Sequence, residues 1–314
     1  MTNDIPRRKD GGIKFSFRPS TEEELKACLS DPLWRICSGA LYKIIIKGDD
    51  DKDGLIMEFK PNRAQKRLIA SLWHRNVILK ARQLGFTTLV CIIWLDTALF
   101  SENVRCGIIA QDREAAEAIF RDKVKFAYQN LPELLRLKMP LARDSASELL
   151  FAHNNSSIRV ATSMRSGTIH RLHVSEFGKI CAKYPDKAVE VITGSIPAVP
   201  LNGILIIEST AEGQEGEFYN ITQRAKALFD AGTELSMRDY RYHFFAWWDE
   251  PKYVMPLGNI KFTDKDVAYF ERIEAQINRQ LTIEQRAWYI ATRDADFSGS
   301  EEKMWQEYPS TPEE

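Results

Sequence analysis

The segment from Lys80 to Thr88, KARQLGFTT, is the first place where residue types and spacing point to chemistry. The run 76–80 before it is apolar and β-branched, as a buried strand should be, and a helical pattern follows it. A strand, a turning loop and a helix N-terminus together form an anion site, because loop amides and the helix dipole face the anion. Thr87, with Thr88 beside it, can place a hydroxyl on a magnesium ion. The segment therefore predicts binding of nucleotide phosphates.

The loop departs from the usual pattern G-x-x-x-x-G-K-[ST] at two positions. Lys80 stands at the first glycine, and Phe86 replaces the lysine. Either Lys80 or Arg82 can project a cation back onto the β- and γ-phosphates. Taken alone, the segment is equally compatible with an ordinary strand-loop-helix connection that carries incidental basic residues.

A second segment, Arg171 to Glu176 (RLHVSE), reads as a strand that ends in a carboxylate. P-loop ATPases place an acid here that holds Mg²⁺ through water, and a neighbouring glutamate polarises the attacking water. Ser175 stands where the aspartate is expected, so Glu176 is the candidate base. Thr87, Ser175 and Glu176 are the candidate magnesium residues. The alternative is a glutamate that merely ends a strand at the surface.

A third strand, 203–208, ends in Ser209 and Thr210. Their hydroxyls could sense the γ-phosphate and relay its loss, although Ser-Thr after a strand is also common loop chemistry. The value of this segment lies in its order, because it follows the loop and the acidic strand end.

The elements that must position these residues alternate along the chain. Short apolar runs predict strands at 76–80, 104–110, 171–175 and 203–208, and helical patterns lie at 87–100, 112–128, 180–193 and 216–230. A hairpin, 147–152 with 157–162, interrupts the series. This alternation predicts an α/β fold of the P-loop NTPase type, with a mostly parallel sheet and helices on both faces.

The flanking regions differ in character. Residues 1–19 are polar, and we expect them to be mobile. Strands at 42–47 and 55–59 should flank the acidic turn 49–54. This turn resembles the start of a calcium loop but lacks its closing glutamate, because residue 60 is Lys60. A helix is expected within 62–73.

A break in the pattern follows residue 250. Two helices, 263–278 and 282–292, come after it, and the tail 308–314 shows no core-forming residues. We therefore predict an ATPase domain at 1–250 and a linker or lever subdomain at 251–314. The aromatic run that ends in Trp247 and Trp248 is expected to fill a core or a domain seam.

The amino-acid composition narrows the classes of protein to which the chain could belong. The 314 residues are 44% hydrophobic and 28% charged, and the net charge of -1 argues against unaided tight binding to nucleic acid. The five scattered cysteines form no C-x-x-C pair, which disfavours metal clusters and redox dithiols and fits a reducing location. We expect neither a signal peptide nor a membrane span, since no apolar run is long enough.

Four segments in order resemble the ATPase part of the large subunit of tailed-phage and herpesvirus terminases. Residues 59–65 (FKPNRAQ) resemble its adenine-recognition segment, and 80–88 its deviant Walker A loop. Residues 173–177 (HVSEF) resemble its Walker B motif, and 208–210 its coupling motif. The tail 308–312 resembles the stretch before its nuclease domain.

The resemblance implies an ATP- and Mg²⁺-dependent motor that moves double-stranded viral DNA into a procapsid in the host cytoplasm. Expected partners are the portal protein, the terminase small subunit and further copies of the chain in a ring. We expect this chain to lack the nuclease, because little sequence follows Asp296. The alternatives are a helicase-like DNA-dependent ATPase and a nucleotide-binding scaffold with impaired hydrolysis.

The resemblance also assigns residues. Gln65 would recognise adenine, and Arg165 would act in trans as an arginine finger beside the catalytic candidates Lys80, Arg82 and Glu176. The candidate nucleotide-binding residues are Gln65, Lys80, Arg82, Gln83, Gly85, Phe86, Thr87, Thr88, Ser209 and Thr210.

Overall fold

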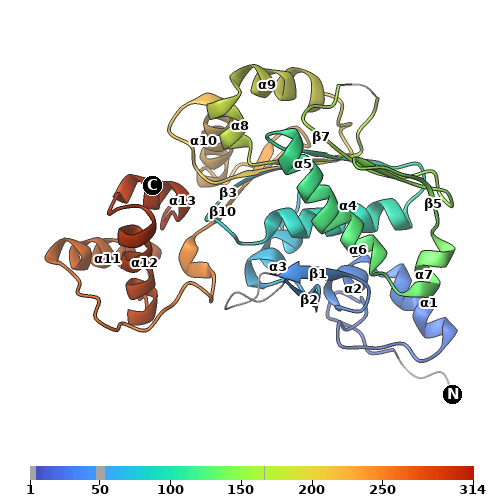
Figure 1. Cartoon of the computed structure of the whole chain (residues 1–314), viewed down its shortest axis with the longest axis horizontal. Helices are drawn as coiled ribbons and strands as arrows, with labels where there is room; N and C mark the ends of the chain where they lie inside the picture. The colour runs from blue at the N-terminus through green and yellow to red at the C-terminus, as the bar shows by residue number, and fades with distance from the viewer. Residues whose placement is uncertain (1–4, 47–53, 166) are drawn as a thin grey trace. The chain divides into compact units, whose positions relative to one another are not determined.

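The computed structural model describes residues 5–46, 54–165 and 167–314. Its main sheet has eight strands in the order β10-β3-β9-β8-β4-β7-β6-β5 (Figure 1). β4 is parallel to both β7 and β8, β10 is parallel to β3, and β6 is antiparallel to β5 and β7. The predicted α/β fold with a mostly parallel sheet is confirmed. The strands are β3 (Arg75–Lys80), β4 (Arg105–Ile109), β5 (Leu141–Asp144), β6 (Glu148–Phe151), β7 (Ser157–Ala161), β8 (Arg171–Ser175), β9 (Ile204–Ser209) and β10 (Tyr240–Phe245).

The chain divides into two compact units. The first comprises Met1–Asn62, Gly85–Ser175 and Val189–Leu205, and the second comprises Arg63–Leu84, Glu176–Ala188 and Ile206–Glu314. Each unit draws on distant parts of the sequence, because strands that are neighbours in a sheet need not be neighbours in the chain.

Helix α4 (Phe86–Phe100) forms the centre of the first unit and packs on β4, β7 and β8. It is apolar around most of its circumference, as a helix buried on all sides must be. Its one acidic residue, Asp96, is buried, and Arg35 donates two hydrogen bonds to it at 2.8 and 2.7 Å. Tyr42 donates a third at 2.7 Å, so the buried carboxylate is fully compensated.

Two predicted helices are less regular than expected. The helix expected at 112–128 is α5 (Arg113–Ile119), a π-helical turn η1 (Phe120–Lys125) and α6 (Phe126–Gln129). The helix expected at 180–193 is α8 (Phe177–Lys183), α9 (Pro185–Glu190) and a second π-helical turn, η2 (Val191–Ser195). Pro185 explains the break after α8, since proline cannot continue a helix. π-helical turns often occur at functional sites.

The sheet has more strands than the sequence indicated. The predicted hairpin is present as β6 and β7, but β7 joins the main sheet beside β4, and β5 extends the edge. Strand β10 was also missed, because its sequence, YRYHFF, mixes polar and aromatic residues. It pairs with β3 along its whole length.

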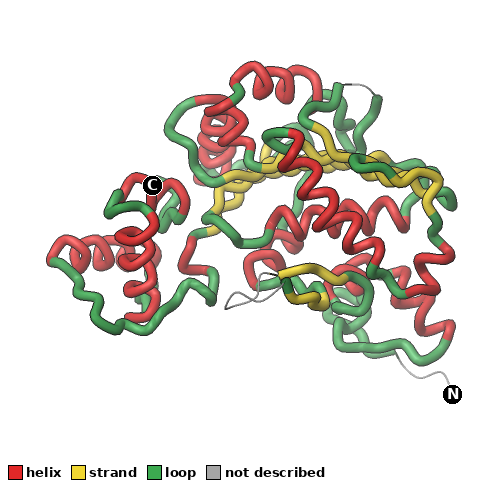
Figure 2. Tube along the Cα trace, viewed as in Figure 1, coloured by secondary structure: helices red, strands yellow, loops and turns green. Residues whose placement is uncertain are grey.

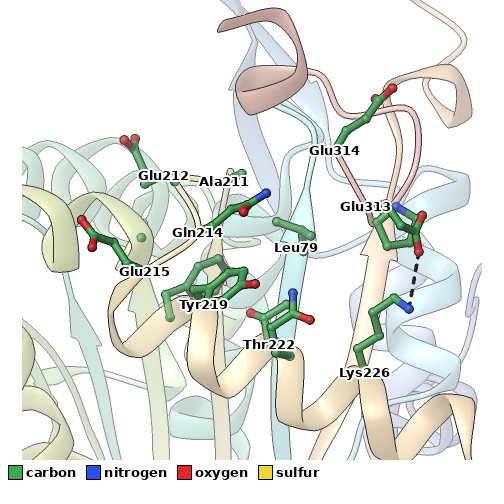
Figure 3. A pocket seen from close by; sticks show the side chains of 15 residues that line it. Leu79, Ala211, Glu212, Gln214, Glu215, Tyr219, Thr222, Lys226, Glu313 and Glu314 are labelled. Atoms are coloured by element: carbon green, nitrogen blue, oxygen red, sulfur yellow. Dashed lines mark ion pairs between the residues drawn. The ribbon is translucent and has the colours of Figure 1, made fainter. Parts of the chain in front are cut away.

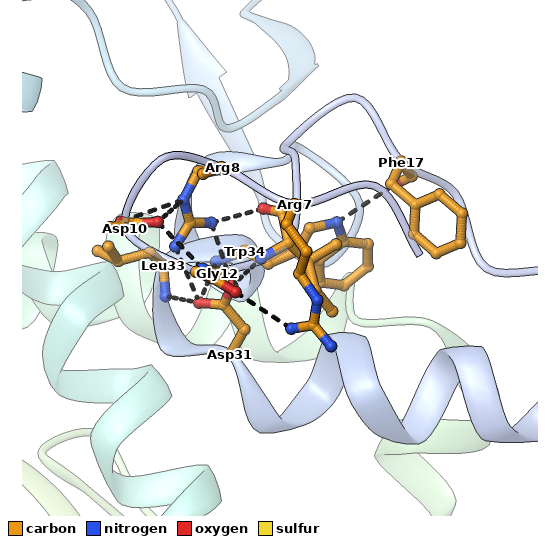
Figure 4. Close-up of polar contacts among 10 residues, drawn as sticks. Arg7, Arg8, Asp10, Gly12, Phe17, Asp31, Leu33 and Trp34 are labelled. Atoms are coloured by element: carbon orange, nitrogen blue, oxygen red, sulfur yellow. Dashed lines mark hydrogen bonds and ion pairs between the residues drawn. The ribbon is translucent and has the colours of Figure 1, made fainter. Parts of the chain in front are cut away.

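Residues 5–19, expected to be mobile, make specific contacts with α1 (Glu22–Ser30) and α2 (Pro32–Cys37) (Figure 4). Ile13 is buried and donates its backbone N–H to Asp31 at 2.7 Å. Arg8 donates to Asp31 at 3.1 Å, and the indole of Trp34 donates to the Phe17 carbonyl at 3.2 Å. The predicted strands nearby are β1 (Lys43–Ile46) and β2 (Leu55–Glu58), whereas most of the acidic turn, 49–53, lies outside the described residues.

In the second unit, α10 (Gly216–Asp230) packs on β3 and β10 and beside α8. α3 (Arg63–Ala70) precedes β3, as predicted. Residues 246–314, all of which are described, form helices and loops without a strand (Figure 2). The helices are a short 3₁₀ turn η3 (Trp247–Asp249), α11 (Asp264–Ile277), α12 (Ile283–Asp296) and α13 (Glu301–Glu307).

These C-terminal helices share an aromatic core. Trp247 is fully buried and stacks on Trp288 at 5.4 Å between ring centroids, which confirms its expected core position. The expectation that the tail 308–314 contributes nothing to a core was wrong. Ser310 is fully buried, and its hydroxyl accepts a hydrogen bond from the Trp247 indole at 2.8 Å. Hydrogen bonding, rather than apolar character, places this polar residue inside.

Among the described residues no helix is both long and apolar enough to cross a membrane. All five cysteines are free thiols, and four of them are buried.

Candidate nucleotide-binding site

Lys80 ends β3 with its side chain only 6% exposed, between two carboxylates. Its Nζ lies 3.1 Å from Glu176 Oε1 and 3.2 Å from Glu208 Oε2. Burial acts to lower the pKa of Lys80, but Glu208 and Glu176 outweigh it and hold the pKa above its ordinary value. The sequence predicted that Lys80 faces nucleotide phosphates. In this structure its ammonium, held in the charged form, binds the candidate catalytic glutamate.

Glu176 precedes α8 in the left-handed region, at φ 53° and ψ 47°. A residue with a Cβ adopts this conformation only at a cost, and such strain is concentrated at active sites. Its carboxylate is 28% exposed, so it can reach both Lys80 and solvent. Lys179 Nζ lies 3.9 Å from the other carboxylate oxygen. The structure thus places the candidate base at the end of β8, beside a cation.

Glu208, on β9, belongs to the segment 208–210 that resembles a coupling motif, but the sequence did not indicate its contact with Lys80. It is fully buried, yet it carries a charge that needs compensation. The signal was present as a glutamate inside the apolar run ILIIES, but its partner Lys80 is far away in the sequence. With Lys80 and Glu176 it forms a cluster of two carboxylates around one ammonium.

Ser209 and Thr210 follow Glu208 and are almost completely buried. Neither hydroxyl has a hydrogen-bond partner among the described residues. Buried hydroxyls are nearly always hydrogen-bonded, so this pair has free capacity for a ligand. Gly178 allows α8 to approach them, since a Cβ at that position would lie 2.8 Å from Ser209 Oγ.

The loop between Lys80 and α4, the candidate phosphate loop, contains two residues in the left-handed backbone region. Gln83 and Gly85 have positive φ, at 58° and 77°, and Gly85 is the N-cap of α4. α4 is 15 residues long, and the positive end of a helix dipole at such an N-terminus suits an anion. The Phe86 side chain is 1% exposed and belongs to the core, so any contact with a nucleotide falls to its backbone.

A second cation approaches this loop from the π-helical turn η1. Lys123 Nζ donates to Thr88 Oγ1 at 3.2 Å. Spacing rules did not identify Lys123, because it is distant in the sequence and its direction depends on the extra residue of the π turn. Thr87 is partly exposed at the start of the same helix, where magnesium binding was predicted.

Arg82 connects the loop to the C-terminal helices. Its backbone N–H donates to the Glu307 carbonyl at 2.9 Å, and its carbonyl accepts from the Tyr253 hydroxyl. Its side chain is half exposed, and Nη1 lies 3.8 Å from Glu307 Oε2. A further hydrogen bond joins Gln306 to Glu212 at 3.1 Å. α13 thus contacts both the phosphate-loop segment and the segment that follows Ser209 and Thr210.

Three further predicted residues are Gln65, Ser175 and Arg165. Gln65 is buried on α3, and Ser175 is buried at the end of β8. Arg165 lies on a loop of the first unit, 62% exposed, with its Nε 2.8 Å from Glu190. That loop packs on η2, since the Met164 N–H donates to Ser195 Oγ at 3.1 Å. An exposed arginine on a supported loop is accessible to a neighbouring molecule.

No protein-family model and no characterised protein sequence matches the chain. Several solved structures are similar to it, among them the following two. The ATPase domain of the Thermus phage P74-26 large terminase matches with a TM-score of 0.51 and 17% identity, over 80% of this chain and 94% of that one. The large terminase of bacteriophage HK97 matches with a TM-score of 0.55 and 15% identity, over 88% of this chain and 54% of that one. The protein therefore has the fold of the ATPase domain of phage large terminases.

Proposed function

We propose that the chain is a magnesium-dependent ATPase whose turnover drives double-stranded viral DNA into a procapsid. The main support for the catalytic part of this proposal is the contact between the buried Lys80 and the candidate base Glu176, with 3.1 Å between Nζ and Oε1. Ser209 and Thr210, which follow the buried Glu208 partner of that lysine, have hydroxyls with free hydrogen-bonding capacity. Cation, base and γ-phosphate sensor are the parts that phosphoryl transfer to water needs.

The phosphates would bind at the N-terminus of α4, where the amides after Gly85 face the anion. Lys80 and Arg82 belong to the loop itself, and Lys123 contacts Thr88 in the first turn of α4, so each of them would supply positive charge to the phosphates. Mg²⁺, when bound, would neutralise charge on the phosphates. Thr87, Ser175 and Glu176, the last through water, offer the oxygen donors that this hard cation prefers.

Glu176 would orient the attacking water and accept its proton. In this structure its carboxylate is engaged by Lys80, so the base becomes free only when the ammonium turns toward another anion. The γ-phosphate is such an anion. Glu208 would retain the lysine at the end of β3 during that exchange.

The C-terminal helices would act as the lever, as the sequence led us to expect for 251–314. The backbone of Arg82 is hydrogen-bonded to Glu307 of α13 and to the Tyr253 hydroxyl. These bonds support the lever role, because a displacement of the loop would displace α13 as well. The Glu212–Gln306 bond offers a second path, from the segment after Ser209 and Thr210.

DNA, the portal protein, the terminase small subunit and a ring of copies are proposed as partners on the basis of the shared fold. The net charge of -1 supports binding of DNA by several copies of the chain together rather than by a basic surface on a single copy. Arg165 would complete the site of a neighbouring copy, and its exposure supports this.

ATP turnover as a function of protein concentration tests this assignment. We expect activity per chain to rise with concentration or on adding the portal, and Arg165→Ala to abolish the rise while ATP binding persists. The matched control is Arg159→Ala on β7. Specific activity that stays flat over a wide range would refute action in trans. Turnover unaffected by Lys80→Ala and Glu176→Ala would refute the ATPase and favour a nucleotide-binding scaffold.

A further inference from the structure

A cavity of about 270 Å³ lies within the second unit (Figure 3). Its walls are the loop 211–215, one face of α10 and the tail 312–314, with Leu79 and Gly178 at its side. The lining residues include neither Lys80 nor Glu176, although Glu212 in its wall also makes the bond to Gln306 described above. The volume is slightly below the range for drug-sized ligands, which begins at about 300 Å³, so it suits a smaller group.

The polar groups around the cavity carry mainly negative charge. Four glutamates line it, at positions 212, 215, 313 and 314, together with a single lysine, Lys226. That lysine is already paired with Asp230 at 2.8 Å and with Glu313 at 3.4 Å. Burial raises the pKa of both Glu212 and Glu314, and the nearby cations (Lys179 and Lys183 for Glu212, Arg272 for Glu314) offset this rise only in part.

The existing partners of these two carboxylates are mostly neutral donors. Glu212 accepts from the Gln306 amide at 3.1 Å. Glu314 accepts from the Ser310 N–H at 2.7 Å and from the Tyr269 hydroxyl at 3.1 Å. Neutral donors orient a carboxylate without cancelling its charge, so the cavity remains attractive to a cation.

Thr222 supplies an observation that is independent of the charge. It is 4% exposed, it lines the cavity from α10, and its hydroxyl has no hydrogen-bond partner among the described residues. A threonine inside a helix ordinarily bonds back to a carbonyl of the preceding turn. An unpartnered buried hydroxyl on a cavity wall marks a position where a ligand can complete the hydrogen bonding.

We propose that this cavity binds an organic cation that carries N–H donors on a short apolar stem, an alkylguanidinium or alkylammonium group. The carboxylates and the Thr222 hydroxyl can all accept hydrogen bonds from such a head group. Leu79, Phe218 and Pro312 line the same cavity and suit the methylenes of the stem. The source of the group is either a free polyamine or an arginine side chain of a second copy of the chain.

The position of the cavity links its occupant to the nucleotide site. Residues 211–215 directly follow Ser209 and Thr210, and Gly178 follows Glu176 by two positions. A bound cation would therefore restrain both segments and alter ATP turnover. This effect on turnover depends on the proposed function, whereas binding of the cation does not.

Calorimetric titration of the full chain with agmatine and with spermidine tests the proposal. We expect saturable binding at one site, and no binding of the neutral 1,4-butanediol. Thr222→Val removes only the hydroxyl and should weaken binding about three- to tenfold, the effect of one hydrogen bond. Glu212→Gln should weaken it at least as much. The matched controls, Thr233→Val and Glu217→Gln, lie outside the cavity and should bind as the wild type does.

The proposal fails if neither cation binds saturably, or if Thr222→Val and Glu212→Gln, shown to be folded by circular dichroism, bind as tightly as their controls. Sedimentation then separates the two sources. Self-association that agmatine reverses assigns the cavity to an arginine of a second copy. Binding that is independent of protein concentration assigns it to a free cation. Saturable cation binding by a wild-type chain that shows no ATP turnover would refute the proposed function and leave the cation site standing.

Discussion

Replacing Lys80 by methionine should destabilise the protein strongly, because it leaves a charge buried without a partner. Glu208 is fully buried, and the Lys80 side chain is 6% exposed, so solvent cannot replace the lost ammonium. Removing one partner of a buried ion pair costs about 3–5 kcal/mol. Lys80→Met should therefore lower the free energy of unfolding by about that amount.

The double variant Lys80→Met/Glu208→Gln gives the sharper test. Replacing both members of a buried pair by neutral groups of similar shape is often close to neutral. We expect the double variant to recover most of the loss, to within about 2 kcal/mol of the wild type. Glu208→Gln alone should cost less than Lys80→Met, because Lys80 keeps Glu176 at 3.1 Å.

Urea unfolding followed by tryptophan fluorescence and circular dichroism measures these differences. Lys179→Met is the control, since Lys179 lies 3.9 Å from Glu176 at a partly exposed position and should matter by less than about 1 kcal/mol. A free energy of unfolding of Lys80→Met within about 1 kcal/mol of the wild type would show that Glu208 is not left as an uncompensated buried charge. The same conclusion would follow from a double variant that is no more stable than Lys80→Met.

Three further predictions concern pH and the loop. Burial, with Arg241 and Arg67, lowers the pKa of His243 to about 3. Stability should therefore be full above the ordinary pKa of 6.5 and fall by about 1.4 kcal/mol per pH unit toward pH 3. In urea unfolding His243→Gln should flatten this dependence, and an unchanged slope would exclude His243 as its source. Lys123→Met should weaken binding of a fluorescent ATP analogue several-fold, whereas Lys125→Met should not, and equal effects would contradict the Thr88 contact. Gly85→Ala, at φ 77°, should cost about 1–2 kcal/mol and weaken the same binding, so a neutral result would show that the loop is not held as described.

The parts of the fold that the sequence predicted are those set by local patterns. β3, β8 and β9 are short apolar runs between helical segments, and this pattern alone indicates a mostly parallel sheet. The loop at Gly85 was recognisable because a strand, a glycine and a helix start occur together. In each case the information lies within about a dozen neighbouring residues.

The parts that were missed depend on partners distant in the sequence. The sequence of β10 shows no clear alternation of apolar and polar residues, so its strand conformation becomes evident only from its pairing with β3. Ser310 is buried through bonds to Trp247 and Trp248, which no hydropathy pattern reveals. The contacts of Glu208 with Lys80 and of Lys123 with Thr88 join residues far apart in the sequence, so the sequence did not predict them. Contacts of this kind follow from the folded topology, so single-sequence patterns cannot supply them.

The central claim, that Glu176 is the base of an ATPase whose cation is Lys80, is tested most directly by ATP turnover and ATP binding measured together. Glu176→Gln keeps the shape of the side chain and removes its basicity. We expect this variant to bind a fluorescent ATP analogue about as tightly as the wild type and to lose at least about 100-fold in turnover, the usual contribution of a general base. Turnover that survives in Glu176→Gln would contradict the central claim.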